Sequence, residues 1–343
     1  MPDLSRRIQA GVLVVFALFT SACTIGNLAG TPIPLPYGGG PQITPGIPFI
    51  IMGGVDDADL LAIYQSSIPF PVPGTWTPVS GPQVLTGDFI QIGLNRGGAM
   101  VTPGGDIQPT PFLSPGVNPA PANSIGFASR QLPTSPSEFD VMIPGCSCEG
   151  WSVKFDYGGS LYHGGADGNL GDPGLFNAGA GTTTLVSAEV SSDGTNFAMR
   201  SVVDVGPLRV TLVIGLRRGD RYASFNITLT NTGTSPITNL RFARSLDFDI
   251  DRAGGGSFSA DRWDVIQVGG VNAIVRGRGA AANPRYYAIA SRSPRLAVTD
   301  GLTFYDTDPD VFGNNDPNDG AGDFSSTFVF RIPTLNAGQS ETL

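Results

Sequence analysis

Residues 202–251 read VVDVGPLRVTLVIGLRRGDRYASFNITLTNTGTSPITNLRFARSLDFDID and carry the clearest secondary-structure pattern in the chain. Apolar residues occupy every second position in residues 208–216, again in 225–229, and again over most of 240–250. Turn-forming residues at 217–220 and 231–236 separate the three runs. Because successive side chains of a strand point to opposite faces, the pattern predicts a meander of three antiparallel strands, with one buried and one solvated face.

The composition favours strands throughout the rest of the 343-residue chain. Gly (47 residues) and Pro (29 residues) are abundant, and only 14% of the residues are charged. No long stretch places apolar residues at helical spacing, so the sequence predicts an all-β fold, a large antiparallel β-sandwich over residues 82–343. A long Gly-rich loop is expected at 158–181. The other expected strands are 89–94, 99–101, 139–144, 151–157, 182–190, 197–205, 263–268, 273–275, 286–290, 296–298 and 326–332.

The first 81 residues are predicted to precede the folded domain. Arg6-Arg7, a short apolar run and small residues before Cys23 are typical of an export signal over residues 1–22, too short to span a bilayer. Residues 20–23 resemble the lipobox of bacterial lipoproteins, in which the cysteine is lipidated. Lipidation of Cys23 and ordinary signal cleavage both stay open. Residues 23–81 are expected to form a Pro/Gly-rich tether with a short helix at 56–67.

The charge balance bears on partners and location. The formal net charge is −9, and Lys154 is the only lysine. An acidic chain without a basic stripe argues against nucleic acid as a partner. We expect an exported protein at the cell-envelope surface or outside the cell, with a lipid anchor as its only membrane attachment. Residues 339–343 resemble the start of a strand, so we expect the natural chain to continue.

Several motifs resemble a β-sandwich domain of exported bacterial proteins, many of which carry a C-terminal sorting tail of the PEP-CTERM type. The resemblance covers residues 85–343, and residues 241–250 are its most specific part. It implies fold and compartment but no catalytic activity. The chain departs from the pattern in lacking the sorting tail. The matching segments are Gly98–Val101, Pro144–Trp151, Ala188–Gly194, Ile227–Gly233, Ile237–Arg244 and Asp247–Ile250.

Two groups of aspartates are candidate cation ligands. Calcium takes six to eight oxygen ligands, and an Asp-rich loop at 306–323 offers carboxylates at short spacing, although it is not an EF-hand. Its candidate ligands are Asp306, Asp308, Asp310, Asp316, Asp319 and Asp323. The alternative is a set of solvated turn residues. Asp247, Asp249 and Asp251 share one predicted strand face, where pairing with arginines competes with a metal. The candidate arginines are Arg241 on the same face, Arg244 on the other face and Arg252 after the triplet.

The cysteines and the single histidine give further candidates. In an exported protein, Cys146 and Cys148 are expected to form a disulfide that acts as a structural staple, in preference to a redox or zinc site. His163 lies in a glycine-rich sequence, and any Ser-His-Asp hydrolase would have to use it, because the chain has no other histidine. A surface-loop histidine is the simpler interpretation.

The sequence alone points to no established activity. We expect a non-catalytic structural or adhesive module that contacts cell-surface or matrix components, glycans among them, with calcium as its one candidate cofactor. The first alternative is a carbohydrate-binding module. It requires several aromatics on one exposed face, drawn from Trp76, Trp151, Tyr157, Tyr162, Trp263, Tyr286 and Tyr287. The second alternative is a glycoside hydrolase that uses paired carboxylates.

Overall fold

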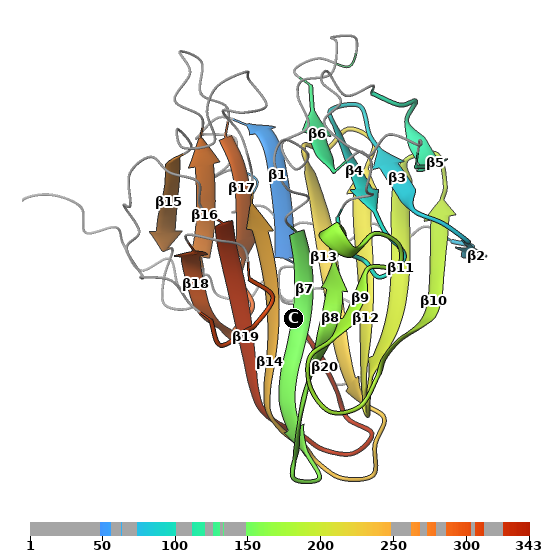
Figure 1. The fold of residues 1–343 in the computed structure, drawn as a ribbon. Helices are drawn as coiled ribbons and strands as arrows, with labels where there is room; N and C mark the ends of the chain where they lie inside the picture. The colour runs from blue at the N-terminus through green and yellow to red at the C-terminus, as the bar shows by residue number, and fades with distance from the viewer. Residues whose placement is uncertain are drawn as a thin grey trace, which may run out of the picture. The chain divides into compact units, whose positions relative to one another are not determined.

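The computed structural model describes residues 49–55, 63, 74–100, 112–120, 126–130, 133, 149–247, 262–267, 273–278, 286–302, 306–311 and 325–343. All of them belong to the unit Pro45–Leu343. They form antiparallel strands in three sheets of ten, six and four strands (Figure 1), which confirms the all-β prediction. Among these residues, no helix is long and apolar enough to cross a membrane.

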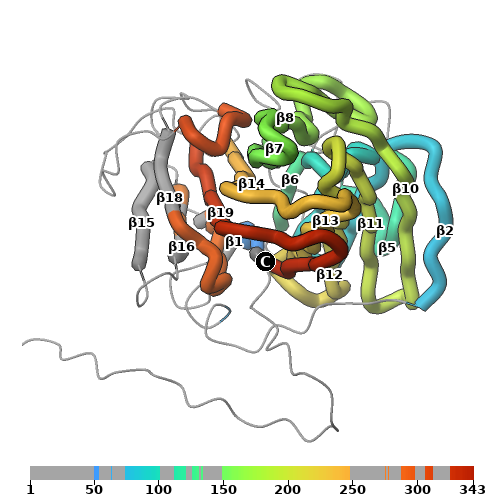
Figure 2. The backbone as a smooth tube through the Cα atoms, turned by 90° about the horizontal axis from the view of Figure 1, so that it is seen from below, coloured from blue at the N-terminus to red at the C-terminus, as the bar shows by residue number. Residues whose placement is uncertain are grey.

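The ten-stranded sheet has β13 (Tyr222–Asn231) near its centre. Two different strands pair with the same edge of β13. β1 pairs with residues 222–225 of β13, and β20 (Ser340–Thr342) pairs with residues 228–230. Figure 2 shows the red C-terminal strand lying beside this part of the sheet. In spatial order the other strands are β15 (Arg262–Gln267), β16 (Ala273–Arg278), β17 (Tyr286–Ser291), β1 (Phe49–Val55), β13 (Tyr222–Asn231), β12 (Leu208–Arg217), β11 (Asn196–Val205), β10 (Thr183–Ser192) and β2 (Thr77–Pro78).

The six-stranded sheet faces the larger one across a shared core (Figure 1). Its order is β18 (Leu296–Leu302), β19 (Ser325–Leu335), β14 (Ile237–Asp247), β7 (Glu149–Tyr157), β8 (Ser160–Asp167) and β9 (Leu175–Asn177), and a 3-10 turn, η1 (Gly168–Leu170), follows β8. The four-stranded sheet has the order β5 (Gly116–Pro119), β3 (Gln83–Thr86), β4 (Ile90–Leu94) and β6 (Phe127–Ser129).

The core consists of the alternating apolar side chains that the sequence predicts. Leu208, Val210 and Leu212 of β12 are fully buried, and so are Phe225 and Ile227 of β13. From the facing sheet, the rings of Trp151 and Phe242 stack with their centroids 6.0 Å apart. Residues of all three sheets join one hydrophobic cluster, so burial of apolar area is the main stabilising term.

The third strand of the predicted meander lies in the other sheet, so that part of the prediction is wrong. β12 and β13 pair as expected, but β14 pairs with β7 and β19. The connection between β13 and β14 is held by the side-chain amide of Asn231, which donates to the carbonyl oxygens of Ser235 and Leu335, each at 2.8 Å. A period of two identifies the faces of a strand but not its partners.

The expected solvated face of β14 is also largely covered. Ala243 and Val329 lie opposite each other across β14 and β19. They are 2% and 0% exposed, although they point away from the core. Ser245 on the same face is 2% exposed. Part of the chain therefore packs over the outer surface of this sheet.

Residues 49–55 fall within the predicted tether but form strand β1. Ile50, Ile51 and Met52 are fully buried, and β1 pairs with β13 and β17. The prediction is wrong for this segment because the run Phe49-Ile50-Ile51-Met52 supplies apolar surface that the flanking Pro and Gly residues obscured. The expected helix at 56–67 lies outside the described residues except for Ile63.

The predicted loop at 158–181 contains β8 and β9, so that prediction is wrong as well. Gly164 and Gly165 are buried residues of β8. A Cβ atom at Gly165 would clash with the backbone oxygen of Trp151, and one at Gly164 with the hydroxyl of Thr183. These glycines therefore allow neighbouring strands to approach closely. Composition alone assigns such a Gly-rich segment to a loop.

Candidate functional site

A row of four basic residues crosses the outer face of the six-stranded sheet. Arg331 of β19 lies opposite Arg241 of β14, which lies opposite Lys154 of β7, which lies opposite His163 of β8. Directly opposed residues of antiparallel strands share a face, and the cations Arg331, Arg241 and Lys154 would repel one another there unless anions separate them. We call Arg331, Arg241, Lys154 and His163 the basic row.

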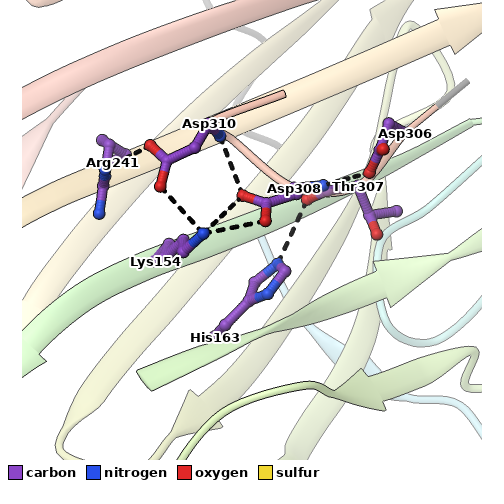
Figure 3. A network of polar contacts seen from close by, with 7 residues as sticks. All are labelled: Lys154, His163, Arg241, Asp306, Thr307, Asp308 and Asp310. Carbon is purple, nitrogen blue, oxygen red and sulfur yellow. Dashed lines mark hydrogen bonds and ion pairs between the residues drawn. The ribbon is translucent and has the colours of Figure 1, made fainter. Parts of the chain in front are cut away.

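Residues 306–311, which we call the acidic segment, lie over this row (Figure 3). The Nζ atom of Lys154 is 2.9 Å from both carboxylate oxygens of Asp308 and 2.9 Å from Oδ2 of Asp310. Arg241 Nη1 pairs with Oδ1 of Asp310. Three carboxylate oxygens thus surround the only lysine of the chain.

Neutral contacts fix the start of the acidic segment. The hydroxyl of Ser245 donates to the Asp306 carbonyl oxygen at 2.9 Å, and His163 Nε2 lies 3.4 Å from the Thr307 carbonyl oxygen. The imidazole ring of His163 also meets the Phe176 ring edge-on, with centroids 5.6 Å apart. The side chain of His163 is therefore buried on strand β8, where it packs against Phe176 and the backbone of Thr307. The prediction of a surface-loop histidine is wrong.

The local sequence sets the shape of the acidic segment. The Asp308 N–H donates to Oδ1 of Asp306 at 2.7 Å, and the Asp310 N–H donates to Oδ1 of Asp308 at 2.9 Å. Aspartate side chains commonly bond the backbone two residues ahead in this way. Aspartates at alternate positions, with Pro309 between the last two, therefore present the Asp308 and Asp310 carboxylates to the row.

The electrostatics of the site keep its ion pairs charged. Burial by itself raises the pKa of Asp308, but hydrogen bonds from Lys154 and from the Asp310 N–H outweigh it, so this pKa is below its ordinary value. Burial by itself lowers the pKa of Lys154, and the two carboxylates more than offset it, so this pKa is raised. The side chains of Lys154, Asp308 and Asp310 are 14%, 30% and 35% exposed, so solvent screens these pairs.

Three of the six predicted calcium ligands lie among the described residues. Asp306, Asp308 and Asp310 lie together in the acidic segment, with Lys154 and Arg241 as cationic partners of the last two. Asp316, Asp319 and Asp323 lie outside the described residues. Within the described ranges, no three His, Cys, Asp or Glu residues are grouped so that they could hold a metal ion. Calcium binding by the whole loop stays a prediction.

Other sequence candidates fall largely outside the described residues. Cys23, Cys146 and Cys148 do so, and so do Asp249, Asp251 and Arg252. Asp247 is the last residue of β14 and is 8% exposed. The aspartate face of β14 is therefore seen only at that position, while Arg241 on the same face pairs with Asp310.

The predicted aromatic side chains do not line an exposed face where the structure describes them. Trp151 and Tyr287 are 1% and 3% exposed, and Tyr157 and Tyr162 pack against the core. The Arg200 guanidinium covers the Trp76 ring at 4.7 Å from its centroid. The side chains of Trp263 and Tyr286 lie outside the described part. None of the described rings offers the open platform on which a sugar would stack.

A second acid–base pair lies in the core, and sequence reasoning missed it. Arg244 Nη2 is 2.6 Å from Oε1 of Glu149, and both side chains are 0% exposed. The Met100 N–H donates to Oε2 of Glu149, and Arg244 Nη2 donates to the Gly98 carbonyl oxygen at 3.2 Å. The guanidinium also lies over the ring of Phe225, 4.3 Å from its centroid. The pair thus joins β7, β14, β13 and the turn after β4.

A signal for this pair is present in the sequence. Arg244 occupies a position on the apolar face of β14, in step with Leu240, Phe242 and Leu246. A charged residue at such a position needs a buried partner. Burial raises the pKa of Glu149 to about 7, although Arg244 and the Met100 N–H act in the opposite direction. Met100, Glu149 and Arg244 are far apart in the sequence, and they meet here.

The two sites have different chemical capacities. The buried pair is enclosed in the core and has no exposed atom to offer a ligand. The basic row offers cationic donors on the outer face, and its present occupant is a carboxylate-bearing peptide segment.

Comparison with known protein families finds no family model that matches the chain, and a search of curated proteins finds no significant match.

Proposed function

We propose that the chain is a non-catalytic structural or adhesive β-sandwich module of an exported protein. The observation that carries this proposal is the basic row with its acidic segment. Ion pairs there tie the acidic segment to β7 and β14, and the contact between His163 and the Thr307 carbonyl oxygen ties it to β8. Such a site supports binding and mechanical attachment through complementary charge.

Neither Asp308 nor Glu149 has the properties that the hydrolase alternative requires of a general acid. A general acid needs a pKa near the working pH and access to the substrate. Asp308 has a lowered pKa and holds Lys154. Glu149 has a pKa raised to about 7, but its side chain is 0% exposed. In the described part of the chain, neither carboxylate combines a suitable pKa with access.

The proposed setting is the cell envelope or the extracellular space, with cell-surface or matrix components as partners. It rests on the export signal that the sequence predicts at residues 1–22. Calcium binding by the loop at 306–323 is a separate proposal, because Lys154 and Arg241 already neutralise two of its candidate ligands.

Three measurements test the proposed function together. Antibody labelling of intact producing cells is expected to find the chain at the surface, and purified chain is expected to adsorb saturably to envelope material. A panel of chromogenic glycosides and esters is expected to show no turnover. Turnover that disappears in the Asp308→Asn or Asp310→Asn variant would overturn the proposal, and so would confinement of the chain to the cell interior.

A further inference from the structure

The basic row has more cationic capacity than the acidic segment uses. Arg331 is exposed, and within the described residues no carboxylate pairs with it. The Nε atom of Arg241 is buried and has no hydrogen-bond partner, although Nη1 of the same side chain holds Asp310. A buried donor without an acceptor costs free energy, so this end of the row is suited to a further anion.

Nearby charges leave this end of the row available. Asp156 lies on the same face two residues from Lys154, but its Oδ2 accepts a hydrogen bond from Asn239 at 2.7 Å. Arg295, whose carbonyl oxygen accepts from the Arg331 N–H, pairs with Glu341 at 2.6 Å. Asp156 and Glu341 thus have partners of their own, and neither of these described carboxylates pairs with Arg331.

The acidic segment is held mainly by screened ion pairs. The side chains of Asp308 and Asp310 are 30% and 35% exposed, and partly exposed pairs of this kind are individually weak. An internal segment nonetheless competes at an effective concentration on the order of millimolar, because the chain tethers it beside the row. A partner in solution must displace it, and each screened contact makes displacement easier.

We propose that the basic row is a docking surface for an acidic peptide segment of another protein, and that residues 306–311 occupy it as an internal competitor. The internal occupant defines the chemistry of the partner: an extended segment with carboxylates at positions i and i+2, as in Asp308 and Asp310. A longer acidic segment would also reach the exposed Arg331. This inference rests on the proposed adhesive function and names a partner class for it.

The test compares the full chain with its Asp308→Asn/Asp310→Asn variant, which removes the internal carboxylates. The probe is a labelled synthetic peptide with the sequence of residues 306–311, and the matched control peptide has Asn in place of its second and third Asp. Fluorescence anisotropy at low ionic strength is expected to show at least tenfold tighter binding of the probe to the variant than to the wild type. The control peptide is expected to bind neither protein.

Further variants make the result specific to the row. Adding Lys154→Gln and Arg241→Gln to the double variant is expected to weaken binding at least tenfold, because these two side chains hold the internal carboxylates, and 0.5 M salt is expected to weaken it as well. Equal binding to wild type and variant, or binding that persists after both cations are replaced, would overturn the proposal. So would binding of polygalacturonate without binding of the peptide, because the partner would then be a polysaccharide.

A measurement on the wild type covers the case in which the variant does not fold. Excess probe peptide is expected to speed hydrogen exchange at the Asp308 amide, because displacement separates this partly buried residue from Lys154 and the sheet and exposes it to solvent. Unchanged exchange at saturating peptide would also overturn the proposal. Failure here is distinguishable from failure of the proposed function, since adsorption to envelope material is measured independently.

Discussion

Strands β7 and β14 carry an acid–base interaction on each face of the same sheet. On the inner face, Glu149 and Arg244 are both 0% exposed. On the outer face, Lys154 and Arg241 hold the partly exposed Asp308 and Asp310. The residue types are nearly the same, and the two sites lie only a few residues apart along both strands. The two sites differ in burial, and burial decides how much free energy is lost when a charged partner is removed.

The difference follows from desolvation. Transfer of a charge out of water costs several kcal/mol, and a buried partner offsets that cost only while both members are present. A partly exposed pair loses little solvation and gains little from its partner. The inner pair is therefore expected to be sensitive to the loss of either member. The outer network is expected to tolerate substitutions and to respond to salt and ligands.

The largest expected effect is the loss of one member of the inner pair. Arg244→Met leaves the Glu149 carboxyl buried without its cation and is expected to cost about 3–5 kcal/mol of unfolding free energy. Urea denaturation at pH 8 measures it. The matched control is the double variant Glu149→Leu/Arg244→Met, which is expected to recover most of the loss. A cost below that of an outer-face substitution would break the comparison.

The pH dependence of the inner pair comes next. Burial raises the pKa of Glu149 from 4.5 to about 7, so the native state binds the proton more tightly than the unfolded chain. The contribution of this group is fully present below pH 4.5 and is lost as the pH rises through 7. The loss is about 3 kcal/mol by linkage. The unfolding free energy of wild type relative to Glu149→Gln, measured from pH 4 to 8, is expected to fall. A flat difference would contradict this cause.

The outer network is expected to show the opposite slope and a smaller effect. The pKa of Asp308 is lowered, so its contribution is present above the ordinary value and is lost as the pH falls below it. Asp308→Asn is expected to cost about 1 kcal/mol or less at pH 7. Chemical denaturation is to be repeated at pH 3 and in 1 M salt, where the difference should become smaller. A cost that is undiminished in both conditions would show that the site is not governed by screened charge.

The smallest expected effect is that of calcium on the wild type. Lys154 Nζ occupies the space between Asp308 and Asp310, 2.9 Å from the nearest oxygen of each, so it competes with a metal ion for these ligands. The thermal midpoint is expected to rise less with calcium in the wild type than in Lys154→Met, because only ligand bound to the folded form stabilises it. A larger rise in the wild type would place the calcium ligands elsewhere in the loop.

The sequence predicts the strands of this molecule better than their partners. Period two at 208–216 and 225–229 predicts β12 and β13 and their buried faces. It cannot show that β14 lies in the opposite sheet, because an apolar face fits either side of a core. The strand at 49–55 is hidden among prolines and glycines. Gly164 and Gly165 are read as loop residues because the close approach they allow is visible only in three dimensions.

The two charge sites were predictable to different degrees. Asp306, Asp308 and Asp310 stand out as a cluster, but their partners Lys154 and Arg241 are far away in sequence, and only strand register brings them together. Arg244 interrupts an apolar face and could have been recognised as a buried charge. Its partner Glu149 could not have been identified, since nothing local relates β7 to β14.

The shared edge of β13 has a consequence for the order of folding. Its two partners there, β1 and β20, come from opposite ends of the described chain, and Thr228 and Thr342 are 114 positions apart. Contacts of such long range form slowly and late. This edge therefore stays incomplete until residues 340–342 have been synthesised, even if the pairing of β12 with β13 forms early.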